Sequence, residues 1–443
     1  MCPPIGLHLD VLRLGCLDLG SAVSPVHVIV QTYQDLVLFH CWPQYKMLPT
    51  MFVSEFWCYY PGSTDTSMPL LQSNPQKSTK HQVTRTAAHN LSMHSYRLLA
   101  PFFLILSSLA IASPHPNHTP SWHSLAPIPL LSRQEHSTLF LPPSTIVILG
   151  GIIPSNDINL AVPFDTTAVM QFYSITTNTW TSRAPIPQPL NHVNAAVVDG
   201  KIYLLGGLAE SGGPENRAWR AVAECWMYDP SSDTWVELPS VPAGQERGSA
   251  AVGVFESHIY LAGGVTALEL YGNQTQATVS VVSVFDIVAQ KWLDVPEPAK
   301  YMPEGRDHAG AAVVGGKMYA LGGRERGPSN VKNTVFVLNL CGLEAGWKVS
   351  AARMPTARGG VAAGIVGRRI YTFGGEGNSA VESGVFAQVE AYDTVKDKWY
   401  SAGSMRVPRH GTYAVGVGGR VYVPGGGIVQ GGGPVSDFDV FMP

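Results

Sequence analysis

Apolar residues in this chain gather in short runs separated by turns, from about residue 122 to the C-terminus. The segment AAVVDGKIYLLGG illustrates the unit, because two β-rich runs flank a tight turn at Asp199-Gly200. This pattern predicts a pair of antiparallel strands. A variable loop follows, and then two further runs, CWMYDP and TWVELP. We therefore expect four short strands in each unit.

The unit recurs along the chain. A glycine doublet, usually after an apolar run, appears six times at spacings of 51 to 59 residues and ends at Gly151, Gly207, Gly264, Gly323, Gly375 and Gly426. A tryptophan recurs out of phase with it, at Trp122, Trp180, Trp235, Trp292, Trp347 and Trp399. Four strands in about 50 residues are typical of one blade of a β-propeller. We expect the tryptophans to pack between blades, since large aromatic side chains dominate core burial.

The recurring Gly-Gly, Tyr and Trp pattern resembles the kelch repeat over residues 122–443. The resemblance implies an all-β fold, a six-bladed kelch β-propeller. Only seventeen residues follow Gly426, and they supply one strand, SDFDVF, without a tryptophan. The segment SWHSLAPIP from Ser121 matches TWTSRAPIP from Thr179. We therefore expect the N-terminal strand that carries Trp122 to close the last blade, which would remove an exposed sheet edge.

The segment before the repeats has the features of an export signal. Residues 98–112 are apolar but too few for a comfortable membrane span. Met93 and Arg97 lie just upstream, and Ala110-Ile111-Ala112 provides the small-x-small pattern of a cleavage site. Read from Met93, the segment predicts a secreted, extracellular protein. An internal buried or anchoring segment is the alternative interpretation.

This interpretation divides the chain into four parts. Residues 1–92 are an unstructured extension or a wrongly extended start, residues 93–112 a signal peptide, residues 113–121 a short linker, and residues 122–443 the propeller. Export would make Asn117 and Asn273 glycosylation sites, because each begins an Asn-x-Thr sequence.

Composition narrows the function classes further. Charged residues make up 14% of the chain and the net charge is −3, so nothing favours a nucleic-acid partner. The six cysteines include no CxxC pair, which leaves a zinc or thioredoxin-like site without support. We predict no cofactor and no metal, no stable membrane span after signal cleavage, and a monomer.

One face of the propeller carries the candidate binding residues. Counting back sixteen residues from the first glycine of each doublet gives a register that holds Arg247, Arg306, Arg358 and Arg409. Arg133 lies one residue away from this register in the first blade, and Leu190 occupies it in the second blade. Two residues further on lie His136, His192 and His308. Residues two apart on a strand point the same way, so both sets are expected to line one channel mouth. The loops expected on that face carry Glu210, Arg217, Trp219, Arg220, Tyr271, Arg324, Arg326 and Glu376.

The residues leave several functions open. An arginine-lined mouth would receive an anionic group from a small ligand or a protein partner. Alternatively, the arginines bridge blades through backbone carbonyls. A binding module is our main prediction, and catalysis is left open.

Among enzymes, the layout is similar to that of sugar-acid epimerases of the kelch type, for which Glu135, Glu246 or His308 would be acid/base groups. Copper-radical oxidases are disfavoured, because the chain contains no Tyr-His dipeptide. The Glu-x3-Asp-x3-His run of the iron-linked specifier proteins is absent as well.

Overall fold

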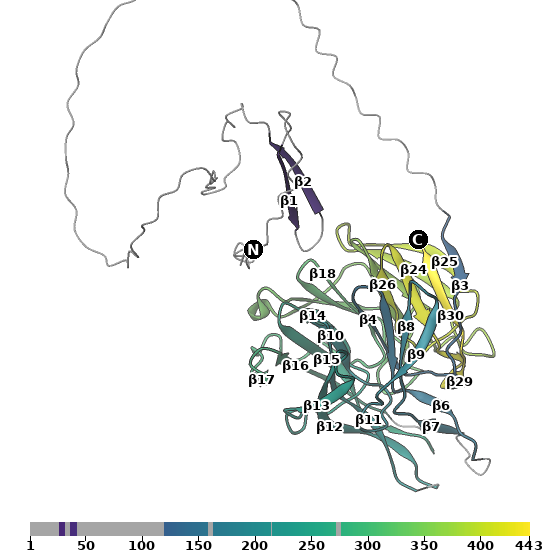
Figure 1. Cartoon of the computed structure of the whole chain (residues 1–443). Helices are drawn as coiled ribbons and strands as arrows, with labels where there is room; N and C mark the ends of the chain where they lie inside the picture. The colour runs from purple at the N-terminus through teal and green to yellow at the C-terminus, as the bar shows by residue number, and fades with distance from the viewer. Residues whose placement is uncertain (1–25, 32–35, 42–118, 158–162, 214, 272–275) are drawn as a thin grey trace, which may run out of the picture. The chain divides into compact units, whose positions relative to one another are not determined.

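The computed structural model describes residues 26–31, 36–41, 119–157, 163–213, 215–271 and 276–443 (Figure 1). The chain divides into two units, of which one contains Gly6–Ala110 and the other Met1–Ile5 with Ile111–Pro443. In the first unit β1 (Val26–Gln31) pairs antiparallel with β2 (Leu36–Cys41). The predicted signal peptide and the two predicted glycosylation sites, Asn117 and Asn273, lie outside the described residues.

The second unit is all-β and has a propeller-like arrangement of antiparallel sheets with kelch repeats. Four of the sheets have four strands each. They contain β4 (Ser137–Leu141), β5 (Thr145–Leu149), β8 (Met170–Ser174) and β9 (Thr179–Arg183); β18 (Gly310–Val314), β19 (Lys317–Leu321), β20 (Val335–Asn339) and β21 (Trp347–Val349); β22 (Ala362–Val366), β23 (Arg369–Phe373), β24 (Gln388–Asp393) and β25 (Lys398–Ser404); and β26 (Val415–Val417), β27 (Arg420–Pro424), β30 (Phe438–Met442) and β3 (Ser121–Ser124).

A fifth sheet has eight strands, because two long hairpins pair with each other. It contains β10 (Ala195–Val198), β11 (Lys201–Ser211), β12 (Ala218–Asp229), β13 (Thr234–Leu238), β14 (Ala251–Phe255), β15 (His258–Glu269), β16 (Gln276–Asp286) and β17 (Lys291–Leu293). The outer part of β12 pairs with β15, with Trp219 opposite Leu268. Two short ribbons, β6 (Ile152–Pro154) with β7 (Phe164–Thr166) and β28 (Gly427–Val429) with β29 (Gly432–Pro434), and the short 3-10 helix η1 (Leu343–Ala345) complete the described elements.

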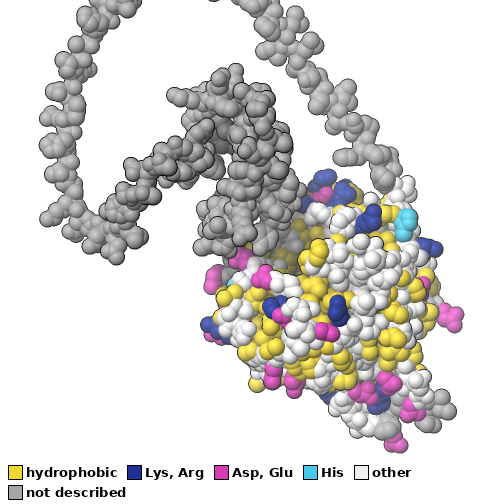
Figure 2. Space-filling model, in the orientation of Figure 1, with side chains coloured by type: hydrophobic (Ala, Val, Ile, Leu, Met, Phe, Trp, Pro, Cys, Tyr) yellow, Lys and Arg dark blue, Asp and Glu magenta, His cyan; other side chains and the backbone are white. Residues whose placement is uncertain are grey.

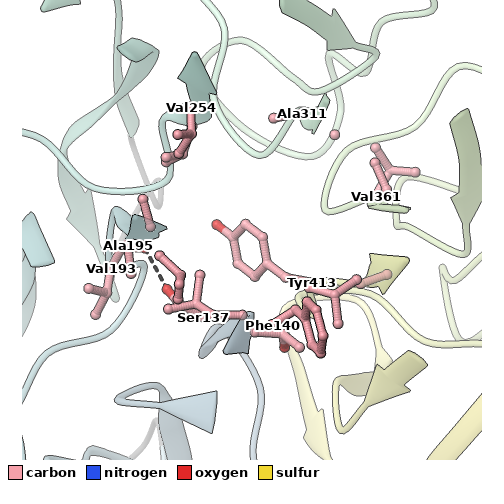
Figure 3. A pocket seen from close by; sticks show the side chains of 17 residues that line it. Ser137, Phe140, Val193, Ala195, Val254, Ala311, Val361 and Tyr413 are labelled. Atoms are coloured by element: carbon pink, nitrogen blue, oxygen red, sulfur yellow. Dashed lines mark hydrogen bonds between the residues drawn. The ribbon is translucent and has the colours of Figure 1, made fainter. Parts of the chain in front are cut away.

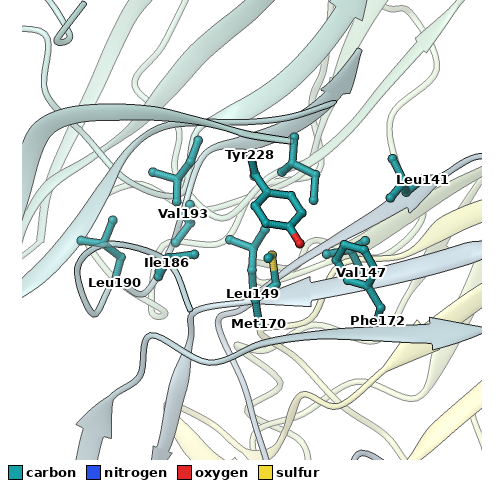
Figure 4. Close-up of a cluster of buried hydrophobic side chains, with 12 residues drawn as sticks. Leu141, Val147, Leu149, Met170, Phe172, Ile186, Leu190, Val193 and Tyr228 are labelled. Carbon is teal, nitrogen blue, oxygen red and sulfur yellow. The ribbon is translucent and has the colours of Figure 1, made fainter. Parts of the chain in front are cut away.

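The first strands of these sheets surround a central channel. Each neighbours the next in a closed order, β4, β10, β14, β18, β22, β26 and back to β4. Apolar residues fill the space between adjacent sheets, as in the cluster of Val147, Leu149, Met170, Leu204 and Tyr228 (Figure 4). Burial of this kind stabilises the fold by about 25 cal/mol per Å² of apolar surface.

The recurring tryptophans connect consecutive repeats. Each indole N–H donates to a backbone carbonyl that lies shortly after the preceding tryptophan of the series: Trp180 to Ala126, Trp235 to Ala184, Trp292 to Pro239, Trp347 to Ala299 and Trp399 to Ala352. Trp122 donates to Ser404, which follows Trp399. The strand that carries Trp122, β3, pairs with β30, with Trp122 opposite Phe441.

The glycine doublets allow the sheets to approach closely. Gly374 and Gly375 have φ of 56° and 106°, a region that side chains rarely adopt. The Gly375 N–H donates to the Arg409 carbonyl of the next sheet at 2.9 Å, and a Cβ on Gly374 would collide with that same oxygen. The doublet is therefore required by contact between sheets as well as by backbone conformation.

The visible face of the space-filling view shows charged side chains of both signs scattered among apolar ones (Figure 2). Among the described residues no helix has the length and apolar character needed to cross a membrane.

Candidate functional site at the channel mouth

Six residues, one shortly before each of the strands β4, β10, β14, β18, β22 and β26, form a closed hydrogen-bonded ring across the channel. We call them the central ring: Glu135, His192, Ser249, His308, Gly360 and Gly411. Each backbone N–H donates to the preceding member of the ring, and distances run from 2.6 to 3.2 Å. The acceptor is a carbonyl at every step except one, where the His308 N–H donates to the Ser249 hydroxyl.

All members of the ring have a left-handed backbone, with φ between 51° and 60°. Glycine adopts this conformation freely, as at Gly360 and Gly411, whereas for a residue with a side chain it costs roughly 1–2 kcal/mol of conformational free energy. Glycine would therefore adopt the backbone conformation of Glu135, His192 and His308 with less strain. Such strain concentrates at functional sites and marks these side chains as candidates.

The ring brings two histidines together from repeats that are not adjacent. His192 Nε2 lies 2.9 Å from His308 Nε2, and Glu135 Oε2 lies 3.3 Å from the former and 3.9 Å from the latter. All three side chains are buried. The channel thus collects imidazole and carboxylate groups whose residues lie far apart along the chain.

Buried charged groups surround this trio. Arg324 binds Asp307 through Nε at 3.1 Å, contacts Glu376 through Nη1, and places Nη2 3.0 Å from His308 Nε2. His410 Nδ1 lies 3.4 Å from Glu376 and 3.9 Å from Glu135. Asp307 and Arg324 belong to one repeat, whereas Glu376 and His410 belong to two later ones, so only the closed fold assembles the cluster.

The surrounding charges set the protonation of the cluster. Burial would raise the pKa of Glu376, but His410 and Arg324 outweigh it and lower that pKa to about 2. Burial also opposes ionisation of Asp307, yet hydrogen bonds and charge from His308 and Arg324 keep its pKa below the ordinary value. Burial, together with His308 and Arg324, holds the pKa of His192 well below its usual range. The cluster therefore keeps ionised carboxylates beside a neutral imidazole.

A pocket of about 200 Å³ opens above the cluster, and we call it the mouth pocket. Its lining includes Glu135, His192, His308 and Glu376, which we call its floor, and Phe164 and Trp219, which we call its wall. The Trp219 ring packs 5.7 Å from the His192 ring, centroid to centroid. The pocket therefore joins a polar floor to an aromatic wall, which is typical of small-molecule sites.

Several buried polar atoms in the mouth pocket lack a hydrogen-bond partner among the described residues. They are Gln134 Oε1, Gln276 Oε1 and Trp219 Nε1. Buried polar groups in native proteins are almost always paired, and each exception calls for an explanation such as a missing ligand or water. A bound molecule with both donors and acceptors would satisfy them.

The other end of the channel is different in character. A second cavity of about 270 Å³ is lined by the first strands, with Val193, Val254, Val361 and Phe140 on its walls (Figure 3). Tyr413 points into it, and its few polar groups include Ser137, which donates to the Val193 carbonyl at 2.6 Å. The chemistry is therefore concentrated at the mouth pocket.

The five predicted arginines are buried beside the channel: Arg133, Arg247, Arg306, Arg358 and Arg409. Arg247 donates to the Gly263 and Leu261 carbonyls, and Arg358 donates to the Gln388 carbonyl and to Glu390 at 2.7 Å. Burial lowers the pKa of Arg247 to about 9, so it remains charged at neutral pH. These bonds join strands of one sheet, so they support a structural role within each sheet and not the bridging of neighbouring blades. The anion-binding role stays a prediction.

The three predicted histidines separate into two groups. His192 and His308 meet in the central ring, whereas His136 lies against Gly425 and between the charges of Arg133 and Arg409. Burial and those charges lower the pKa of His136 to about 3. Glu135 takes the ring position of that repeat, because the repeat has one additional residue between its arginine and its doublet.

Sequence reasoning missed the ring role of Glu135 and the parts played by Asp307 and His410. Alignment on the arginine instead of the doublet would have found Glu135, since every ring member lies two residues after Arg133, Leu190 or an equivalent residue. Among the predicted loop residues, Trp219, Arg324 and Glu376 reach the mouth pocket. Glu246 accepts instead from the Gly244 N–H, and Arg217 and Arg220 pair with Glu210 and Glu269.

Comparison with known proteins gives consistent matches. The KLHDC2/KLHL20/DRC7 Kelch-repeats domain matches residues 117–323, and the Kelch motif matches residues 305–343 and 357–406. Kelch-like protein terF of Aspergillus terreus is 39% identical over 362 residues, which cover 80% of this chain and 75% of that protein. Beta-scruin of Limulus polyphemus is 25% identical, over 54% of this chain and 24% of its own length.

A solved structure, "Structure of YjhT", has a similar fold with a TM-score of 0.56. It covers 71% of this chain and 95% of its own, at 17% sequence identity.

The buried arginines give a first testable prediction. Arg358→Gln would leave Glu390 buried without its partner, which typically costs about 3–5 kcal/mol. We expect the urea midpoint to fall accordingly. Arg353→Gln, a change of an exposed arginine in the same connection between β21 and β22, is the matched control and should leave the midpoint unchanged. Equal midpoints for the two variants would contradict a structural role for Arg358.

Proposed function

Since the chain belongs to the kelch-repeat family, we propose that it is a ligand-binding propeller whose binding site is the mouth pocket. The observation that carries the proposal is the set of unpaired buried polar atoms around this pocket. Gln134 Oε1 and Gln276 Oε1 would accept from hydroxyl groups, and the Trp219 indole would donate to an oxygen.

The pocket indicates the class of ligand. Its volume of about 200 Å³ is below the roughly 300–1,000 Å³ of drug-sized sites. Phe164 and Trp219 provide an apolar wall, and the ionised Glu376 lies at the floor. We propose that the ligand is a small hydroxylated ring compound. The anionic group predicted from the sequence is a finer proposal, in which the positive charge of the five buried arginines attracts one acidic group on that compound.

A change at Trp219 tests the ligand proposal. Trp219→Phe keeps the aromatic wall but removes the N–H, so loss of one hydrogen bond should weaken binding by about 3- to 10-fold. Monosaccharides, sugar acids and small phenols would be screened by thermal shift, and hits measured by calorimetry. Trp235→Phe is the control, because its indole bonds Ala184 away from the pocket.

Two outcomes would contradict this proposal: no probe binds, or a hit binds Trp219→Phe and the unchanged chain equally. A preference for sugar acids that declines with added salt would support the anionic-group prediction.

An acid–base enzyme acting on a sugar acid is the second candidate. It is favoured by the approach of Glu135 to His308, at 3.9 Å, on the floor of the same pocket. A protein partner at this face would instead leave small probes without effect.

We propose that the propeller has six blades and that β3 closes the last one. The eight-stranded sheet then counts as two blades joined by their long hairpins. Support comes from the closed order of the first strands, the pairing of β3 with β30, and the bond from Trp122 to Ser404.

The closure can be tested by comparing two tryptophans. Trp122 packs on Phe373 and Phe441, as Trp399 packs on Tyr392 within a sheet formed by consecutive strands. Trp122→Ala and Trp399→Ala should lower the free energy of unfolding by similar amounts, about 2–4 kcal/mol in urea titrations. Unchanged stability in Trp122→Ala alone would contradict closure.

We also propose that the protein is secreted, with Met93 as its natural start and cleavage after Ala112. Edman or mass-spectrometric sequencing of the natural protein should therefore find an N-terminus at Ser113. A peptide from before Met93 would contradict the proposed start.

A further inference from the structure

The two ring histidines approach each other in an unusual way. His308 Nδ1 lies 2.6 Å from Asp307 Oδ1, and His192 Nδ1 lies 2.6 Å from Asn191 Oδ1. Both acceptors require a proton on Nδ1, because carboxylate and amide oxygens only accept. A ring without a second proton therefore presents a lone pair at Nε2, and the two Nε2 atoms are 2.9 Å apart. Two facing lone pairs repel unless a proton or a metal ion lies between them.

The partners of Nδ1 are arranged as they are around metal-bound histidines. A ligating imidazole almost always donates its other N–H to a carboxylate, carbonyl or water, which fixes the tautomer and the ring orientation. Asp307 and Asn191 fulfil this role here, and the Asn191 amide is held in turn by a 2.8 Å bond to Thr166.

A carboxylate completes the set. Glu135 Oε2 lies 3.3 Å and 3.9 Å from the two Nε2 atoms, and ligand atoms bound at about 2.1 Å to one ion lie about 3.0–3.4 Å apart. The needed adjustment is a few tenths of an ångström. Two imidazoles and one carboxylate are a ligand set that suits Zn²⁺ and other divalent first-row transition metals.

Charge points the same way. Three carboxylates, those of Glu135, Asp307 and Glu376, lie close together in this buried cluster, and Arg324, His308 and His410 are their neighbours. Buried charges must be paired or coordinate metal. A divalent cation bound beside Glu135 would add positive charge next to this group of carboxylates.

We propose that Glu135, His192 and His308 bind one divalent transition-metal ion at the floor of the mouth pocket. The left-handed backbone at all three positions holds the ligands toward one another, and the pocket leaves the ion an open side for water or ligand. Arg324 Nη2, which lies 3.0 Å from His308 Nε2, must release that one contact, while the bonds of Arg324 Nε to Asp307 and of Nη1 to Glu376 remain.

This inference deepens the proposed function, since the ion would occupy the same pocket, but its test needs no small molecule. The full chain would be stripped with EDTA and titrated with Zn²⁺ and with Co²⁺. Bound metal would be counted by mass spectrometry after desalting, and Co²⁺ absorption would report coordination. We expect about one ion per chain at the site, with Co²⁺ bands typical of nitrogen and oxygen ligands.

The variants assign the ion to the ring. Glu135→Gln, His192→Gln and His308→Gln should each weaken Zn²⁺ binding at least about 100-fold, and Asp307→Asn about 10- to 100-fold. His192→Gly is a second variant that suits the left-handed backbone, as glycine does at Gly360. His136→Gln, a buried histidine outside the ring, is the matched control and should bind normally.

Metal that survives in the His192→Gln/His308→Gln double variant belongs to other residues of the chain. The proposal is overturned if the unchanged chain retains no ion, or if the folded double variant retains as much as the unchanged chain. Trp219→Phe should keep the metal, so loss of small-molecule binding there would not bear on the metal site. Conversely, absence of metal would leave the hydrogen-bonding pocket to be tested separately.

Discussion

The closed ring of backbone hydrogen bonds at the centre of the channel is the constraint on which the rest of the propeller depends. Each ring residue donates to its neighbour, so the position of one repeat is defined by the next, and the Glu135 N–H completes the circle at the Gly411 carbonyl. The left-handed backbone is needed for these groups to face one another, because an extended strand would direct them within its own sheet. A chain of such contacts is satisfied only when every repeat is present.

The glycine doublets and the arginines also help to close the propeller, at positions further from the channel axis than the central ring. The Gly426 N–H donates to the Arg133 carbonyl, as Gly375 does to Arg409, so the last doublet bonds to the first repeat. The arginine side chains then turn back into their own sheets and bind carbonyls or a buried acid such as Asp439. The guanidinium N–H groups thus donate to backbone carbonyls that would otherwise lack hydrogen-bond partners. This explains why a residue so costly to bury recurs in nearly every repeat.

The candidate site arises because some repeats have a residue with a side chain, instead of glycine, at the position that forms the central ring. Gly360 and Gly411 show what the backbone requires there, and Glu135, His192 and His308 add side chains at a conformational cost. Because the ring is narrow, any side chain on it meets side chains from other repeats. A few substitutions in a repeated scaffold can therefore assemble a polar cluster without changing the fold. The aromatic wall comes from the extended β12 and the ribbon of β6 and β7, which rise above the ring.

The sequence by itself determined the local units: short strands, turns at glycine, the recurring doublet and tryptophan, and the kelch family. These features are local because backbone conformation and strand pairing within a hairpin depend on neighbouring residues. It also identified His192, His308, Trp219 and Arg324 as candidates on one face. Only the tertiary structure decided which of them meet. Doublet spacing put His136 beside the other two histidines, whereas one additional residue in that repeat gives the ring position to Glu135. His192 and His308 belong to non-adjacent repeats, yet the closed channel brings their side chains together. Whether a buried arginine faces ligand or carbonyl likewise depends on packing between sheets, which no local pattern specifies.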